Sequence, residues 1–148
     1  HDWWSGSRLA RLSWKMQASW KLDARTLEYY RELNASDSPT WKTCRDQLEA
    51  LQRIEPTLAI VIFPMLVDLA THPFRPVHLE VADACKQAEV IDLQDALARR
   101  AGGNTPGLWV HPTDTHPNEI AHEVAAGVIS KRLETLLRVP AKPPLSVP

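Results

Sequence analysis

Apolar side chains recur every three or four positions through residues 7–53, the spacing that gathers them along one side of a helix. One such stripe is formed by Leu9, Leu12, Met16 and Trp20, and another by Trp41, Cys44, Leu48 and Leu51. Ser38 stands directly before Pro39, and a serine cap followed by proline in the first turn favours a helix start at this point. We therefore expect a helical N-terminal segment over residues 7–53.

The pattern changes to a continuous apolar run at 58–63, with the sequence LAIVIF. A strand without polar side chains needs cover on both faces, which is typical of interior strands in parallel sheets. A second short strand, EVIDL, is predicted at 89–93, and LWV at 108–110 is a third extended candidate. Helical spacing between the first two strands predicts a βαβ unit, so the expected fold class is α/β with a parallel sheet.

The last helix is predicted over residues 117–137, next to a stretch rich in titratable side chains, HPTDTHPNEIAHE at 111–123. Pro117 suits the first turn of a helix, so His116 is expected at the helix entrance. Ligands of doubly wound folds bind where strand ends meet helix N-termini, which makes His116 a candidate functional residue. Asp92, at the end of its predicted strand, is expected to cap the following helix or to end the strand.

Two convincing strands are too few to supply the neighbours that the strand at 58–63 requires, so the predicted sheet is incomplete. The chain also begins with His1 instead of Met. These observations predict that residues 1–138 are the C-terminal part of a larger α/β domain, whose remainder lies upstream of His1. Residues 139–148, VPAKPPLSVP, are predicted to be a proline-rich tail.

Composition and charge add a few restrictions. With 17 Lys and Arg against 18 Asp and Glu, the formal net charge is -1, so no global field attracts a polyanion and no nucleic-acid partner is expected. No apolar run is long enough to span a bilayer and no signal peptide is visible, which indicates a soluble protein of unknown localisation. Cys44 and Cys85 lack metal-site spacing and are expected to be small core residues.

The tryptophan-rich N-terminal stripe has a second interpretation. Basic residues and tryptophans, among them Arg8, Lys15, Trp14 and Trp20, could place this helix at a membrane interface. Packing against the rest of the protein is the commoner use of such a stripe, and we expect packing.

The run DTHPNEIAHEVAAGVI at 114–129, taken with VIFP at 61–64 and VIDL at 90–93, resembles the last sequence block of the SGNH (GDSL-type) hydrolases. The resemblance covers roughly residues 40–137. It implies part of a three-layer, flavodoxin-like domain with a parallel sheet. It also implies a serine esterase or acyltransferase that acts on an ester substrate and needs no cofactor.

The same resemblance implies roles for two residues. His116 would be the general base that takes a proton from a serine hydroxyl, and Asp114 would orient the ring and stabilise the imidazolium. The common family spacing is Asp-x-x-His, whereas Asp114 is two positions before His116, and strict register puts Thr113 in the acid's place. Because threonine offers no charge, Asp114 is the preferred acid.

The family's nucleophile and oxyanion-hole blocks are not recognisable in the sequence. Ser5 and Ser7 follow no predicted strand, so neither is expected to be a nucleophile. We therefore interpret the chain as carrying the Asp/His part of an esterase site, inactive or nearly so alone. The alternative is a non-catalytic, degenerate hydrolase-like module that binds a partner.

Two further interpretations of the histidine cluster are a metal site and a surface role without chemistry. His111, Asp114, His116 and His122 carry suitable ligand groups for a divalent metal. His116 and His122 are six positions apart and would fall on different faces of a helix, so we expect no metal site.

Overall fold

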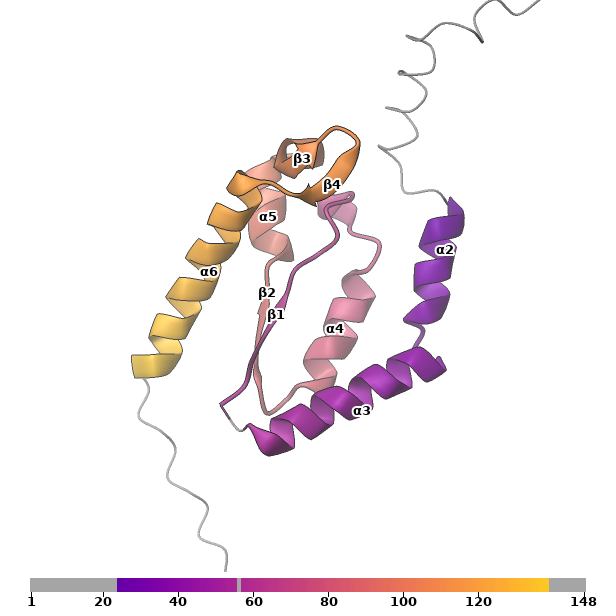
Figure 1. Ribbon diagram of the computed structural model, residues 1–148, viewed down its shortest axis with the longest axis vertical. Coiled ribbons are helices and arrows are strands. Elements are labelled where there is room, and N and C mark those ends of the chain that lie inside the picture. The colour runs from indigo at the N-terminus through magenta and orange to yellow at the C-terminus, as the bar shows by residue number, and fades with distance from the viewer. Residues whose placement is uncertain (1–23, 56, 139–148) are drawn as a thin grey trace, which may run out of the picture.

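The computed structural model describes residues 24–55 and 57–138, in which helices flank the β1–β2 pair and a separate pair, β3–β4, lies at the upper end in Figure 1. The main elements are α2 (Ala24–Leu33), α3 (Pro39–Ile54), β1 (Ala59–Ile62), α4 (Arg75–Ala84), β2 (Glu89–Asp92), α5 (Gln94–Ala101), β3 (Trp109–His111), β4 (Asp114–Pro117) and α6 (Glu119–Arg138). Short 3-10 helices, η2 (Leu69–Thr71) and η3 (Thr105–Leu108), lie in two of the connections.

Helix α3 begins where its sequence signal predicts. Ser38 has extended backbone angles, and its hydroxyl accepts the backbone N–H of Trp41 at 3.0 Å. Pro39 occupies the first turn, where its missing N–H costs no helical hydrogen bond. The predicted helix start at Ser38 and Pro39 is therefore confirmed.

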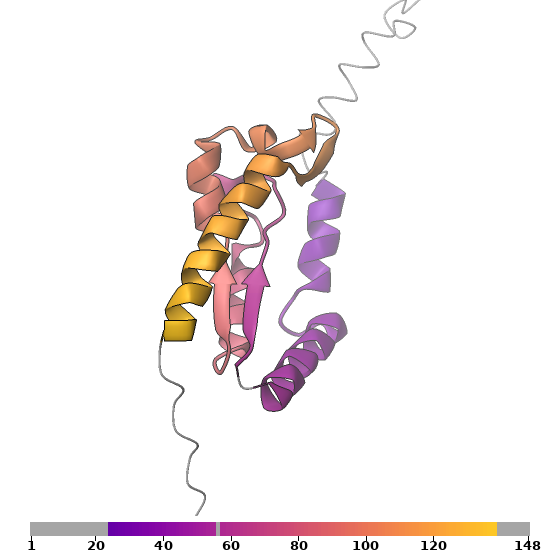
Figure 2. The ribbon, with the colours of Figure 1, turned by 60° about the vertical axis from the view of Figure 1, so that its left-hand side comes forward.

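Strands β1 and β2 pair in parallel and are connected through α4. Ala59 lies opposite Glu89 and Ile62 opposite Asp92, so the two strands are in register along their whole length. The turned view shows α6 in front of this pair of strands and α4 behind it (Figure 2). This β1–α4–β2 unit carries Asp92 at its carboxyl end, the edge at which polar side chains gather.

The predicted fold class, a partial three-layer parallel sheet of flavodoxin-like type, is wrong. The described residues contain one two-stranded parallel sheet and one separate two-stranded antiparallel sheet. The extended segment expected at 108–110 belongs to β3, which pairs with β4 and not with the parallel strands. A local hairpin requires less loop closure than a third parallel strand, and here it takes up the extended segment.

The hydrophobic core lies between β2, α5, α6 and the turn after β1. Its buried members are Leu66, Leu69, Ile91, Leu93, Leu97, Leu108, Trp109, Ala121 and Ala125. The indole N–H of Trp109 donates to the Leu66 carbonyl at 2.7 Å, which satisfies the one polar group of this large side chain. The core therefore holds the start of the hairpin firmly against the parallel unit.

Strand β1 contributes no residue to this core cluster. Val61 and Phe63 are 41% and 37% exposed, although the sequence predicts cover on both faces of this strand. The reason is the position of α6, whose buried residues pack with Ile91 of β2. Among the described residues, the side chains of β1 are therefore more exposed than their apolar composition predicts.

The two cysteines differ from each other. Cys85 is 1% exposed, as expected for a small core residue, and burial raises the pKa of its thiol. Cys44 is exposed on α3, so its predicted core position is wrong. Helix α3 buries Trp41 and Gln52 instead, so Cys44 lies outside its buried face.

Several expectations lie outside the described residues. They are the apolar stripe of Leu9, Leu12, Met16 and Trp20 with its membrane alternative, the serines Ser5 and Ser7, and the tail at 139–148. Within the described residues, none of the helices has the length and apolar character that crossing a bilayer requires.

Candidate functional site

The β3–β4 hairpin carries the residues that the sequence singled out. Asp114 opens β4 opposite His111 of β3, and Pro117 lies opposite Trp109, with an irregularity in the register between these pairs. His116 is therefore part of a strand, and not the entrance of the helix, which begins at Glu119. Because alternate residues of a strand share a face, Asp114 and His116 project on the same side of the hairpin.

Asp114 and His116 form a local pair. Oδ1 of Asp114 accepts the backbone N–H of His116 at 3.0 Å and lies 2.5 Å from Nδ1 of its ring. These bonds hold the pKa of Asp114 below its ordinary value, since the carboxylate accepts from both groups. With Nδ1 directed at the carboxylate, the second ring nitrogen, Nε2, is left for other partners, and the His116 side chain is 84% exposed.

Thr113, the other residue considered for the acid position, lies against a different histidine. Its backbone N–H donates to Nδ1 of His111 at 3.3 Å, and its hydroxyl lies 2.9 Å from the same nitrogen. Thr113 therefore orients His111 within the turn, whereas Asp114 is the residue in contact with His116. The hairpin carries two oriented imidazoles, of which one has a carboxylate partner.

Asn118 fastens the hairpin to the core and starts the last helix. Its side-chain amide donates to the carbonyls of Gly107 at 3.0 Å and Trp109 at 3.2 Å. Its carbonyl oxygen accepts the backbone N–H of Ala121 at 3.1 Å, as an N-cap does. The asparagine of the His-Pro-Asn run thus has a clear structural role in fixing how β4 enters α6.

His122 does not join the hairpin pair. It is exposed in the first turns of α6, where its ring lies 6.2 Å from the ring of Phe63 at the end of β1. Among residues 24–55 and 57–138, no group of three or more His, Cys, Asp or Glu side chains is arranged to hold a metal ion. The four residues considered as metal ligands therefore do not form one ligand set, although Asp114 and His116 are in contact.

A second polar cluster, which the sequence pattern did not predict, lies at the carboxyl end of β2. Oδ2 of Asp92 lies 3.0 Å from Nδ1 of His78, which is 8% exposed. Arg75 reaches the same oxygen at 3.5 Å and also donates to Asp95 at 3.2 Å. Asp92 ends β2, which is one of the two roles expected for it, and its Oδ1 accepts the N–H of Gln94 at 2.9 Å. The N-cap position of α5 itself is Leu93.

His72 extends this cluster into the interior. Its ring lies 5.2 Å from that of His78, and its Nδ1 lies 3.1 Å from the Val67 carbonyl. Its Nε2 is buried without a hydrogen-bond partner among the described residues. Burial lowers the pKa of His72, because the charged ring would lose its hydration. The signal for this cluster was the run THPFRPVH at 71–78, whose basic residues come together only when α4 packs on β2.

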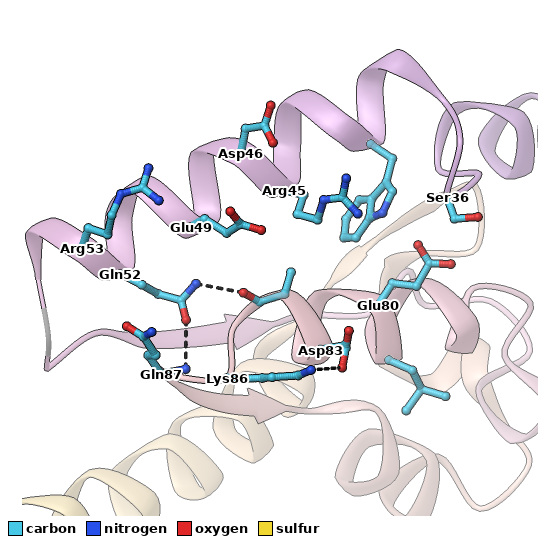
Figure 3. A pocket seen from close by; sticks show the side chains of 13 residues that line it. Ser36, Arg45, Asp46, Glu49, Gln52, Arg53, Glu80, Asp83, Lys86 and Gln87 are labelled. Carbon is cyan, nitrogen blue, oxygen red and sulfur yellow. Dashed lines mark hydrogen bonds and ion pairs between the residues drawn. The ribbon is translucent and has the colours of Figure 1, made fainter.

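A groove between α3 and α4 has a volume of about 1050 Å³. Figure 3 shows charged side chains of both signs along it, among them Arg45, Glu49 and Asp83. Gln52 of α3 links the two sides of the groove. Its side-chain amide N–H donates to the Ala84 carbonyl at 2.9 Å, and its side-chain oxygen accepts the backbone N–H of Gln87 at 3.0 Å. None of the sequence-predicted site residues lines this groove.

Comparison with known proteins gives partial matches to one kind of enzyme. The large subunit of exodeoxyribonuclease 7 from Proteus mirabilis is 31% identical over 80 residues, which are 53% of this chain and 16% of that protein. The corresponding subunit from Shouchella clausii is 32% identical over 94 residues, 63% of this chain and 19% of that protein. The matches thus cover less than a fifth of each relative. No family model and no solved structure matches the chain.

These matches overturn the resemblance to SGNH hydrolases. The matched proteins are named as exodeoxyribonucleases, which contradicts the esterase or acyltransferase activity and the ester substrate. They also contradict the exclusion of nucleic acid, which rested on a net charge of -1. Net charge describes the average field, and it does not exclude contacts made by a few side chains.

Proposed function

We propose that this chain is part of a nucleic-acid-processing protein in which the β3–β4 hairpin presents the Asp114–His116 pair to a phosphodiester. The observation that carries the proposal is the local pair itself, in which Asp114 Oδ1 lies 2.5 Å from the ring Nδ1. The choice of substrate rests on the partial matches to two exodeoxyribonuclease large subunits.

The pair has the arrangement that general-base catalysis requires. A carboxylate on Nδ1 selects the tautomer whose Nε2 carries a free lone pair, and it stabilises the imidazolium that forms later. The lowered pKa of Asp114 favours this role, because the carboxylate stays ionised while the ring gains a proton. Exposure of His116 leaves Nε2 accessible to a large, extended substrate such as a nucleic-acid strand.

The proposed step is hydrolysis of a phosphodiester. Nε2 of neutral His116 takes a proton from a water molecule as the water oxygen bonds to phosphorus. The bond from phosphorus to the leaving sugar oxygen breaks, and that oxygen is protonated by solvent. Asp114 accepts the Nδ1 proton as a hydrogen bond throughout and offsets the charge of the imidazolium.

The test is cleavage of fluorescein-labelled single-stranded and duplex DNA by the full chain and by His116→Gln. Loss of the base should slow cleavage by about 100-fold or more. If the chain cleaves neither DNA, or if His116→Gln cleaves at the same rate, the proposed function is wrong.

The hairpin offers a matched control in His111→Gln. His111 is also an exposed histidine of this hairpin, but its Nδ1 accepts from Thr113 and forms no hydrogen bond to a carboxylate within the described residues. We expect this variant to cleave at nearly the rate of the unchanged chain. Equal losses in the two variants would indicate that the hairpin serves as a general contact surface without a base.

A further inference from the structure

Strand β2 has one edge that pairs with nothing in the described part of the chain. The N–H of Glu89 donates to the Leu58 carbonyl at 3.0 Å, and that of Leu93 donates to the Ile62 carbonyl at 3.1 Å. Because backbone groups of a strand point alternately to its two sides, those of Val90 and Asp92 are directed away from β1. Two residues therefore offer free donors and acceptors along this edge.

A groove runs beside this edge, between β2 and the second half of α6. Its volume is about 390 Å³, and it is lined by residues 89–92 of β2 and by Val128, Lys131, Arg132 and Thr135 of α6. The two views agree that α6 runs alongside β2 (Figures 1 and 2). An edge strand next to a helix is the arrangement in which proteins add an extended peptide as a further strand.

Some of the charged side chains that line the groove already form ion pairs with each other. Arg132 forms an ion pair with Glu89, and this bond raises the pKa of the guanidinium. Lys131 is exposed and has no ion pair within the described residues. Val128 is partly buried and presents the apolar part of the wall. The groove thus combines the unpaired backbone edge of β2, the apolar side chain of Val128 and the positive charge of Lys131, which has no ion-pair partner among the described residues.

We propose that this groove binds an extended segment of a partner protein, which adds to the edge of β2 and places a carboxylate beside Lys131. The backbone of Val90 and Asp92 supplies the register, and Val128 takes an apolar side chain of the segment. Opposite charge makes an acidic side chain the suitable neighbour of Lys131. The proposal is independent of the Asp114–His116 pair, which lies on the hairpin.

The chain's own residues 139–148 are a poor occupant for two reasons. Four of these ten positions are proline, Pro140, Pro143, Pro144 and Pro148, so the backbone lacks the donors that a sheet ladder needs. The segment also has no Asp or Glu to lie beside Lys131. A partner segment with alternating apolar residues and a carboxylate meets both requirements.

The test selects linear peptides from a phage-displayed random library on the full chain and measures their binding by fluorescence anisotropy. Selected peptides should alternate apolar and polar residues and carry an acidic residue. Lys131→Glu should weaken their binding about fivefold or more, and exchanging the peptide's acidic residue for lysine should restore it. Lys42→Glu, on an exposed lysine of α3, should leave binding unchanged.

Amide hydrogen exchange followed by NMR locates the contact. Peptide binding should slow exchange of the Val90 and Asp92 N–H groups, whereas the Glu89 N–H is already bonded. The proposal is overturned if no peptide is selected, if Lys131→Glu binds equally well, or if these two amides stay unprotected. Protection of Val90 without peptide, together with a concentration-dependent dimer in solution, would assign the groove to a second copy and equally overturn it.

Discussion

Two aspartate–histidine pairs in the described structure each join a carboxylate oxygen to Nδ1 of the ring, but one histidine is buried and the other is exposed. Asp92 contacts Nδ1 of His78 at 3.0 Å, and Asp114 lies 2.5 Å from Nδ1 of His116. The His78 side chain is 8% exposed and that of His116 is 84% exposed. The first pair joins residues 14 positions apart on α4 and β2, whereas the second joins residues two apart on one strand.

The difference in burial decides what each pair can do. The Asp92 carboxylate takes the place of hydration that the His78 ring has lost on burial, so removing it leaves the ring uncompensated. An exposed pair gains little free energy of folding, because water already solvates both groups. The exposed pair keeps an accessible Nε2 and suits chemistry, whereas the buried pair holds α4 against β2.

The largest expected effect is on stability, in Asp92→Asn. The variant removes the charge that faces His78 and Arg75, and we expect it to lower the free energy of unfolding by about 3 kcal/mol. The matched change Asp114→Asn should leave the free energy of unfolding nearly unchanged. Urea unfolding followed by circular dichroism compares the two. Equal losses in both variants would remove the distinction between the pairs.

These two pairs also mark how far the sequence could predict the site. Asp114 and His116 lie two positions apart, but their pairing was expected only from the resemblance to SGNH hydrolases, because the strand that brings them to one face was not predicted. Asp92 and His78 are separated by α4 and meet only after that helix has packed on β2. Nothing in the local pattern around Asp92 announces a partner, so the buried cluster needed the structure.

The fold also has features that local sequence signals predict and features that they do not. A local signal placed the start of α3 at Ser38. The end of α5 at Gly102 also has a local cause, since its φ of 55° is a conformation that glycine adopts at little cost. The hairpin escaped prediction because Pro117, read as a helix start, ends β4 instead. Strand pairing depends on residues outside the local window, here Trp109 and His111 opposite β4.

The second expected effect is on catalysis, in the same Asp114→Asn variant. If the carboxylate selects the tautomer of His116, an amide should slow DNA cleavage by about tenfold or more while leaving DNA affinity nearly unchanged. Cleavage rates at saturating DNA, with affinity from fluorescence anisotropy, separate the two effects. In Asp92→Asn, rates corrected for the folded fraction should equal those of the unchanged chain. A loss of affinity without a loss of rate would reassign Asp114 to substrate binding.

The third expected effect is a pH dependence of stability that arises from the buried cluster. His72 has a lowered pKa in the folded state, so below about 6.5 the unfolded chain binds a proton that the folded chain does not. Stability should therefore fall as the pH drops through this range, by at most about 1.4 kcal/mol per pH unit from this residue. Urea unfolding at several pH values should show a shallower slope for His72→Gln.

The exposed His122 provides the control for this pH dependence. His122→Gln should keep the slope of the unchanged chain, since its exposed ring is hydrated in both states. An unchanged slope in His72→Gln would show that other groups carry the acid sensitivity.

The smallest expected effect concerns the support of the exposed pair. Asn118→Ala removes the side-chain hydrogen bonds to the Gly107 and Trp109 carbonyls and the cap of α6. It should lower the free energy of unfolding by about 1 kcal/mol. Asn104→Ala is the matched control, because Asn104 has no side-chain cap bond at η3. Asn118→Ala should also slow DNA cleavage, since β4 would enter α6 less rigidly. Equal stability of both variants would mean that Trp109, buried in the core, suffices to hold the hairpin and that the exposed pair needs no second anchor.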